Sequence, residues 1–149
     1  MKTYKYILFD LDHTLWDFNK NSAETLVQLY DIYRLGDYHK FTRDEFVEKF
    51  GEANIRLWEL YDRNEIGKSK LRLDRFRIIF EELNFSGDDI AANIGDDYLR
   101  LCPEKANLIP NAVEVLEYLS ERYLLYILTN GFSETQYRKL AFSRIEKYF

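Results

Sequence analysis

The segment FDLDHTLW, residues 9–16, places two aspartates, Asp10 and Asp12, directly after an apolar run. That run belongs to YKYILFD, residues 4–10, which is apolar, rich in β-forming residues and ended by an acid. This pattern predicts a buried strand that leads into a loop. Two carboxylates separated by a single residue repel each other, so packing alone gives little reason to place them together. A site that binds a cation or carries out acid–base chemistry does give a reason.

A second strand is predicted at residues 124–129, and it also ends in polar residues. The run YLLYILTNG, residues 123–131, places Thr129 and Asn130 just before Gly131. Both predicted strands are apolar throughout, which is typical of parallel strands covered on both faces. Because ligands bind beyond the carboxyl ends of strands in open α/β sheets, we expect the two polar strand ends to meet.

The residues between the two strands have the periodicity of amphipathic helices. They divide into four segments with short connections, which suggests a small helical bundle, and Thr42 with Glu45 forms a capping-box pattern. A further helix precedes the second strand, and Ser133 with Gln136 predicts a capped helix after it. The sequence therefore indicates an α/β fold with a parallel sheet, in which residues 18–103 are inserted between core segments 1–17 and 104–149.

Composition narrows the classes of function. The chain has 149 residues, of which 46% are hydrophobic and 32% are charged, so it can build a core. Its net charge of −5 argues against a nucleic-acid partner, because phosphate binding needs a basic surface. No segment approaches membrane-spanning length, and the first apolar run is too short for a signal peptide. The single cysteine, Cys102, allows no internal disulfide. We expect a cytoplasmic protein with no membrane partner.

The two aspartates have a clear chemical use. A carboxylate such as Asp10 can attack a phosphoryl group and form an aspartyl phosphate. A second acid such as Asp12 can protonate the leaving oxygen and later activate water. Paired acids also hold Mg²⁺, which offsets the repulsion between a carboxylate and a phosphate. The first strand end therefore predicts phosphoryl chemistry.

The second strand end supplies neutral donors for the same chemistry. The hydroxyl of Thr129, the amide of Asn130 and the backbone N–H groups that open the next helix can all bind phosphate oxygens. Gly131 allows a close approach of the backbone. We therefore predict Thr129, Asn130 and Gly131 as substrate-binding residues.

These segments resemble the haloacid dehalogenase-like hydrolase superfamily. FDLDHTLW matches its D-x-D-x-T signature, and ILTNG, residues 127–131, resembles its second motif. The helical insertion looks like the family's α-helical cap. LIPNAVEVLEYL, residues 108–119, is similar to a family segment that commonly has Pro-Gly where this chain has Pro110 and Asn111. The stretch TNGF, followed by a helix, resembles the pyrimidine 5′-nucleotidase branch, whose members dephosphorylate nucleoside monophosphates.

The resemblance implies a Rossmann-like core and a role for each motif residue. Asp10 would be the nucleophile, Asp12 the general acid/base, and Thr14 the support of their loop. Thr129 and Asn130 would bind the transferring phosphoryl group. Mg²⁺ would be held by the Asp10 carboxylate and the backbone carbonyl of Asp12. The implied activity is a Mg²⁺-dependent phosphatase acting on a small phosphate ester, with a nucleoside monophosphate as the favoured substrate.

Two other family motifs are not found in this sequence. They are a lysine that bridges nucleophile and phosphate, and an acidic strand end that completes the Mg²⁺ site; both follow the second motif in the family. Here residues 132–149 follow that motif, and Lys139 and Lys147 are predicted to be solvated charges. Residues 95–97, Gly-Asp-Asp, are predicted to lie on an exposed helix face.

We therefore expect an N-terminal portion of a longer enzyme that is catalytically weak alone. A two-strand core leaves an open sheet edge and uncovered apolar surface, which would allow self-association or completion by another segment. A phosphomutase keeps both acids and stays open as an alternative. Dehalogenation needs no acid/base at the second position, so Asp12 argues against it. A non-catalytic or truncated chain is the third alternative.

Overall fold

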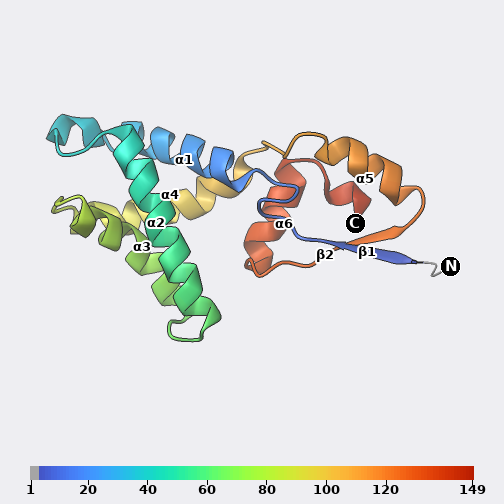
Figure 1. Ribbon diagram of the computed structural model, residues 1–149. Coiled ribbons are helices and arrows are strands. Elements are labelled where there is room, and N and C mark those ends of the chain that lie inside the picture. Colours follow the sequence, from blue (N-terminus) through green and yellow to red (C-terminus); the bar gives the residue numbers. More distant parts are fainter. Residues whose placement is uncertain (1–3) are drawn as a thin grey trace. The chain divides into compact units, whose positions relative to one another are not determined.

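The computed structural model describes residues 4–149, apart from the side chains of Leu73 and Asp88. The chain divides into two compact units, residues 4–22 with 101–149 and residues 23–100. Figure 1 shows the course of the chain, in which the inserted unit is entirely helical. Within residues 4–149, none of the helices combines the length and the hydropathy that a membrane crossing requires.

The first unit is built around a two-stranded parallel sheet. Strands β1 (Tyr6–Phe9) and β2 (Leu124–Ile127) pair in register, with Tyr6 opposite Leu124 and Phe9 opposite Ile127. Helix α5 (Ala112–Ser120) precedes β2, and helix α6 (Ser133–Phe142) follows it (Figure 1). Two short 3₁₀ segments complete the unit, η2 (Cys102–Glu104) and η3 (Glu146–Tyr148). The predicted parallel strands are confirmed, although each is shorter than predicted.

The two faces of this sheet differ in burial. Leu125 faces the covered side, where Leu116 of α5 is also buried. The opposite face is exposed, and the aromatic rings of Tyr6 and Tyr126 lie 5.9 Å apart on it. The uncovered apolar surface expected of a two-strand core is therefore confirmed, whereas the cover on both faces that the apolar strands indicated is not found in the described residues. Apolar composition indicated burial, but alternate side chains of each strand point to a face that remains open.

The second unit contains the four predicted helices. Helix α1 (Phe18–Ile32) enters it from the first unit and is followed by η1 (Leu35–Tyr38), α2 (Arg43–Asp62), α3 (Lys68–Glu82) and α4 (Asp88–Leu101). The capping box of α2 is confirmed, because Thr42 and Glu45 each accept a hydrogen bond from the other's backbone N–H. Buried aromatic side chains fill the interior, with Phe46 stacked on Phe80 at 6.1 Å.

Candidate active site

The loop after β1 is fixed by hydrogen bonds to one carbonyl. The Leu11 carbonyl accepts the N–H groups of Leu15 and Trp16 at 2.9 Å and that of Thr14 at 3.3 Å. His13 takes a left-handed conformation with φ of 64°, and its N–H donates to the Trp16 carbonyl at 3.0 Å. Leu11 and Trp16 are fully buried, so the backbone that carries the motif aspartates follows a defined path.

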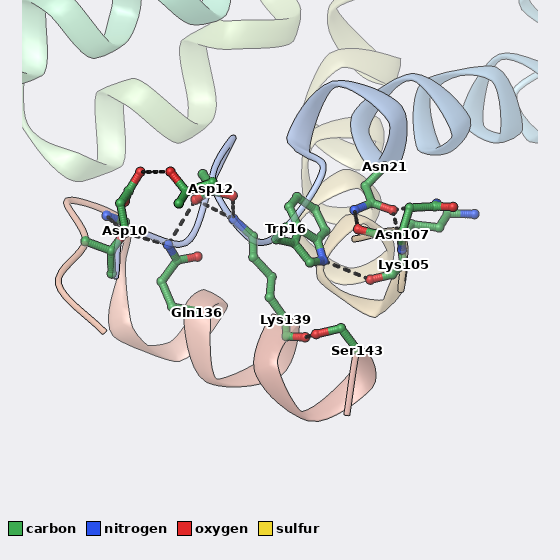
Figure 2. Close-up of polar contacts among 12 residues, drawn as sticks. Asp10, Asp12, Trp16, Asn21, Lys105, Asn107, Gln136, Lys139 and Ser143 are labelled. Carbon is green, nitrogen blue, oxygen red and sulfur yellow. Dashed lines mark hydrogen bonds and ion pairs between the residues drawn. The ribbon is translucent and has the colours of Figure 1, made fainter. Parts of the chain in front are cut away.

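A second set of hydrogen bonds fastens this loop to the segment before α5. The indole N–H of Trp16 donates to the Lys105 carbonyl at 3.1 Å, and the Asp17 N–H donates to the Asn107 carbonyl at 3.1 Å. The side chains of Asn21 and Asn107 also meet, with Asn107 Nδ2 2.7 Å from Asn21 Oδ1. Figure 2 shows the contacts of Trp16 with Lys105 and of Asn21 with Asn107 beside the aspartates. The loop after β1 is therefore fixed by its own backbone hydrogen bonds and by hydrogen bonds to Lys105 and Asn107.

Asp10 is the exposed member of the aspartate pair. It follows the last residue of β1, and its Oδ2 accepts a hydrogen bond from the Thr14 hydroxyl at 3.4 Å. The Thr14 side chain is thus in contact with the Asp10 carboxylate. An exposed carboxylate at the carboxyl end of a parallel strand is accessible to a ligand.

Asp12 is the more buried member, and its carboxyl group accepts hydrogen bonds from two side chains of α6. Nζ of Lys139 lies 2.6 Å from Oδ1 and 2.8 Å from Oδ2, and Nε2 of Gln136 lies 2.9 Å from Oδ2 (Figure 2). The Lys139 side chain is 7% exposed, and its ammonium lies 4.5 Å from the centre of the Trp16 ring. The prediction of a solvated Lys139 is therefore wrong, because α6 turns this side chain toward the β1 loop.

Gln136 connects the two strand ends. Its Nε2 donates to Asp12 and also to the Thr129 hydroxyl oxygen, which lies 2.7 Å away. The prediction that the polar strand ends meet is thereby confirmed. The predicted capping box at Ser133 is wrong, because Phe132 is the N-cap residue and makes no side-chain cap hydrogen bond. The Gln136 side chain is used in the site instead.

Thr129 accepts two hydrogen bonds, and Gly131 makes room for one of the donors. The Gly131 N–H lies 3.1 Å from Thr129 Oγ1. A Cβ atom at position 131 would overlap Nε2 of Gln136 and lie 2.6 Å from its Cδ. Asn130, between them in sequence, is exposed. At the second strand end, Thr129 is therefore hydrogen-bonded to Gly131 and Gln136, while Asn130 stays accessible.

The available oxygen donors fit a Mg²⁺ ion that is shared with a substrate. The Asp12 carboxyl group is occupied by nitrogen donors, which leaves the Asp10 carboxylate and the Asp12 backbone carbonyl as candidate ligands. Across residues 4–149, no cluster of three or more His, Cys, Asp or Glu side chains could hold a metal. Mg²⁺ commonly takes one or two carboxylates and completes its shell with water and substrate phosphate.

Sequence reasoning missed Gln136 and Lys139 as parts of this site. A usable signal was present, because residues three apart on a helix share a face. The helix begins just after the second strand end, so its first inward-facing polar residues can reach the neighbouring strand end. Their spacing alone did not reveal which face is buried.

Comparisons with known proteins cover nearly the whole chain. Residues 4–149 match a family model described as haloacid dehalogenase-like hydrolase. The pyrimidine 5′-nucleotidase PynA of Streptococcus pneumoniae is 31% identical over 98% of this chain and 59% of its own length. The pyrimidine 5′-nucleotidase YjjG of Escherichia coli is 27% identical over 98% of this chain and 60% of its own length.

A third relative also has a solved structure. The HAD-hydrolase YfnB of Bacillus subtilis is 28% identical over 100% of this chain and 60% of its own length. Its crystal structure, described as bound to magnesium, matches 99% of this chain and 63% of that chain with a TM-score of 0.85. The chain therefore spans about 60% of the length of the curated relatives it matches.

Proposed function

This chain belongs to the haloacid dehalogenase-like hydrolases, and we propose that it acts as a phosphomonoester hydrolase with Asp10 as its nucleophile. The observation that carries the proposal is the bridge formed by Gln136 between Asp12 and Thr129. It places a carboxyl group and a hydroxyl group together beyond the carboxyl ends of two parallel strands. The exposed Asp10 carboxylate lies at the end of the first of these strands.

The reaction uses the two aspartates in turn. An Asp10 oxygen forms a bond to phosphorus as the ester P–O bond breaks. Asp12, the charged partner of Lys139 in the free protein, takes up a proton from solvent as the substrate binds and gives it to the leaving alcohol oxygen. Asp12 then takes a proton from a water molecule, whose oxygen attacks the same phosphorus. Inorganic phosphate leaves, and the Asp10 carboxylate and the Asp12 proton are both restored.

The second strand end binds the group that is transferred. The Thr129 hydroxyl and the Asn130 amide donate to phosphoryl oxygens, and the N-terminus of α6 adds the favourable end of its dipole. Mg²⁺ would be held by the Asp10 carboxylate and the Asp12 backbone carbonyl. When bound, it offsets the repulsion between the Asp10 carboxylate and the phosphate. The relative YfnB, whose crystal structure is described as magnesium-bound, supports this choice of ion.

We further propose a small phosphorylated metabolite as substrate, and within that class a nucleoside monophosphate. The support is the naming of two relatives, PynA and YjjG, as pyrimidine 5′-nucleotidases. In this proposal residues 18–103 form the family's helical cap, and residues 1–17 with 104–149 belong to its core. Action in the cytoplasm is part of the same proposal, since the single cysteine of these 149 residues, Cys102, allows no disulfide within them, which fits a reducing compartment.

A phosphate-release screen of the complete natural protein tests the proposal. Nucleoside monophosphates and sugar phosphates are supplied with Mg²⁺, and the expected result is release of inorganic phosphate from at least one of them. Asp10→Asn should lower kcat by about a thousandfold or more, because it removes the nucleophile. Asp96→Asn, at an exposed position on α4, is the matched control and should keep the rate.

Two results would contradict the hydrolase proposal. One is a wild-type protein that releases no phosphate from any ester in the screen. The other is an Asp10→Asn variant that keeps its activity. A phosphomutase is distinguished in the same assay, because it moves the phosphoryl group to another substrate oxygen without releasing phosphate.

A further inference from the structure

We propose that Gln136 and Lys139 are positioning residues of the reaction. They hold the Asp12 carboxyl group in one orientation, and Gln136 also leaves the Thr129 hydroxyl proton free for the phosphoryl group. This inference rests on the proposed function and assigns roles to two residues that lie outside both sequence motifs.

The orientation of Asp12 is set by three contacts on its two oxygens. Lys139 reaches Oδ1 at 2.6 Å and Oδ2 at 2.8 Å, and Gln136 reaches Oδ2 at 2.9 Å. Both donors are themselves held, since Gln136 is 4% exposed and Lys139 is 5% exposed. A carboxyl group on a loop would otherwise rotate. Small errors in the placement of an acid/base group lower the rate strongly, so fixing this rotation serves catalysis.

The hydroxyl of Thr129 is prepared as a donor by the same amide. A threonine hydroxyl has one proton and accepts through two lone pairs. Both lone pairs face N–H groups, that of Gly131 at 3.1 Å and that of Gln136 at 2.7 Å. The remaining proton must therefore point to a third group. A phosphoryl oxygen, which only accepts hydrogen bonds, matches this requirement.

In this arrangement, the carbonyl oxygen of the Gln136 amide, Oε1, is left without a hydrogen bond within residues 4–149. This oxygen is buried. Turning the amide over would supply no remedy, because Oε1 would then face the oxygens of Asp12 and Thr129. Burial of an unpaired carbonyl disfavours folding. The amide is therefore oriented for its two acceptors, and Gly131 leaves it the space to do so.

Steady-state kinetics of the complete natural protein tests these roles. Gln136→Leu and Lys139→Met should each lower kcat about 10- to 100-fold, with KM changed less than about threefold, because they disturb orientation and leave binding groups in place. Lys139→Arg should restore most of the loss, since a guanidinium also donates to both carboxyl oxygens. Lys147→Met, at an exposed lysine, is the control and should keep the wild-type kcat.

A second pair of variants disturbs Gln136 through the neighbouring Gly131. Gly131→Ala should also lower kcat, because the new methyl group overlaps the Gln136 amide. Gly51→Ala is its control, since no atom other than the neighbouring backbone of its own helix lies within 4 Å of the added Cβ. The melting temperature of every variant is measured, so that a loss of folded protein is separated from a loss of kcat.

The outcomes separate the two proposals. An inactive wild-type protein overturns both of them. An active wild-type protein whose Gln136→Leu and Lys139→Met variants keep kcat overturns the positioning roles and leaves the hydrolase proposal standing. A loss of kcat that Lys139→Arg does not restore, or one that tracks the unfolded fraction, also overturns them. A loss of kcat at nearly constant KM in folded variants, with rescue by arginine, supports them.

Discussion

The ion pair between Asp12 and Lys139 is a largely buried electrostatic contact at the candidate site. The Lys139 side chain is 7% exposed and the Asp12 side chain 24%, so water screens their attraction poorly. Removing one partner of such a pair leaves the other charge buried without compensation. Replacing both partners by apolar groups removes that penalty.

A single variant and a double variant of this pair test its burial. Asp12→Ala should lower the free energy of unfolding by about 3 kcal/mol, because it leaves the Lys139 ammonium buried alone. Adding Lys139→Met to Asp12→Ala should recover part of that loss, since methionine packs against Trp16 without a charge. Urea unfolding measures both variants. A double variant less stable than Asp12→Ala would contradict the buried ion pair.

The aspartates and the lysine differ in how far sequence could predict them. Asp10 and Asp12 stand in a local pattern of strand, acid, residue, acid, so a chemical use could be inferred without a structure. Lys139 carries no such local signal, because its burial depends on how α6 packs against a loop far away in sequence. A lysine on a short helix is most often solvated, and that expectation failed here.

At the scale of elements, the starts of α2 and α6 also differ in how far the sequence could predict them. The capping box of α2 was predictable because Thr42 and Glu45 satisfy each other within four residues. Ser133 and Gln136 have the same spacing, but the Gln136 side chain instead donates to Asp12 and Thr129, which follow β1 and β2. A tertiary contact thus overrode a local one. Such competition is not visible in the sequence of the helix alone.

A tyrosine with a shifted pKa links the turn after α1 to α4. The Tyr33 hydroxyl donates to Asp97 Oδ2 at 2.9 Å, and burial together with this hydrogen bond raises the pKa of Tyr33 to about 12. The hydrogen bond from Arg100 holds the pKa of Asp97 below its usual value. The neutral phenol and the charged carboxylate are therefore the forms that stabilise this contact.

Alkaline pH should weaken that contact. In the unfolded chain Tyr33 ionises near its usual pKa of 10.0, whereas in the folded chain it ionises near 12. Its contribution to stability is thus complete below pH 10 and disappears as the pH rises through 12. Tyr33→Phe should lose less stability than the wild type over that interval in urea unfolding. Equal losses in both proteins would contradict the assignment.

At the scale of the whole molecule, the exposed sheet face agrees with the uncovered apolar surface that a core of two strands is expected to leave. Strand order, parallel pairing and the inserted helices followed from hydrophobic periodicity and the positions of polar strand ends. Uncovered apolar surface was also expected of a two-strand core. Which face stays open could not be predicted, because the side chains of both strands are apolar on both faces. Five apolar side chains of this face are exposed: Tyr6, Leu8, Leu124, Tyr126 and Leu128.

We propose that this face drives self-association of the 149-residue chain, because exposed apolar surface of this kind favours burial against another surface. Leu8→Lys should shift the chain toward monomer in sedimentation velocity, since a charge on the face opposes its burial. Ile55→Lys is a matched control, with Ile55 61% exposed and Leu8 63% exposed. An unchanged distribution for Leu8→Lys would exclude this face as the contact.

The central claim is that Asp10 carries the phosphoryl group during turnover. Acid quenching of the complete natural protein during hydrolysis of its best phosphate ester, followed by peptide mass spectrometry, tests this claim most directly. The prediction is a phosphorylated peptide that contains FDLDHTLW, with the modification on Asp10, and none from Asp10→Asn. Phosphate release at the wild-type rate by Asp10→Asn, or a phosphoryl group on another residue, would contradict it.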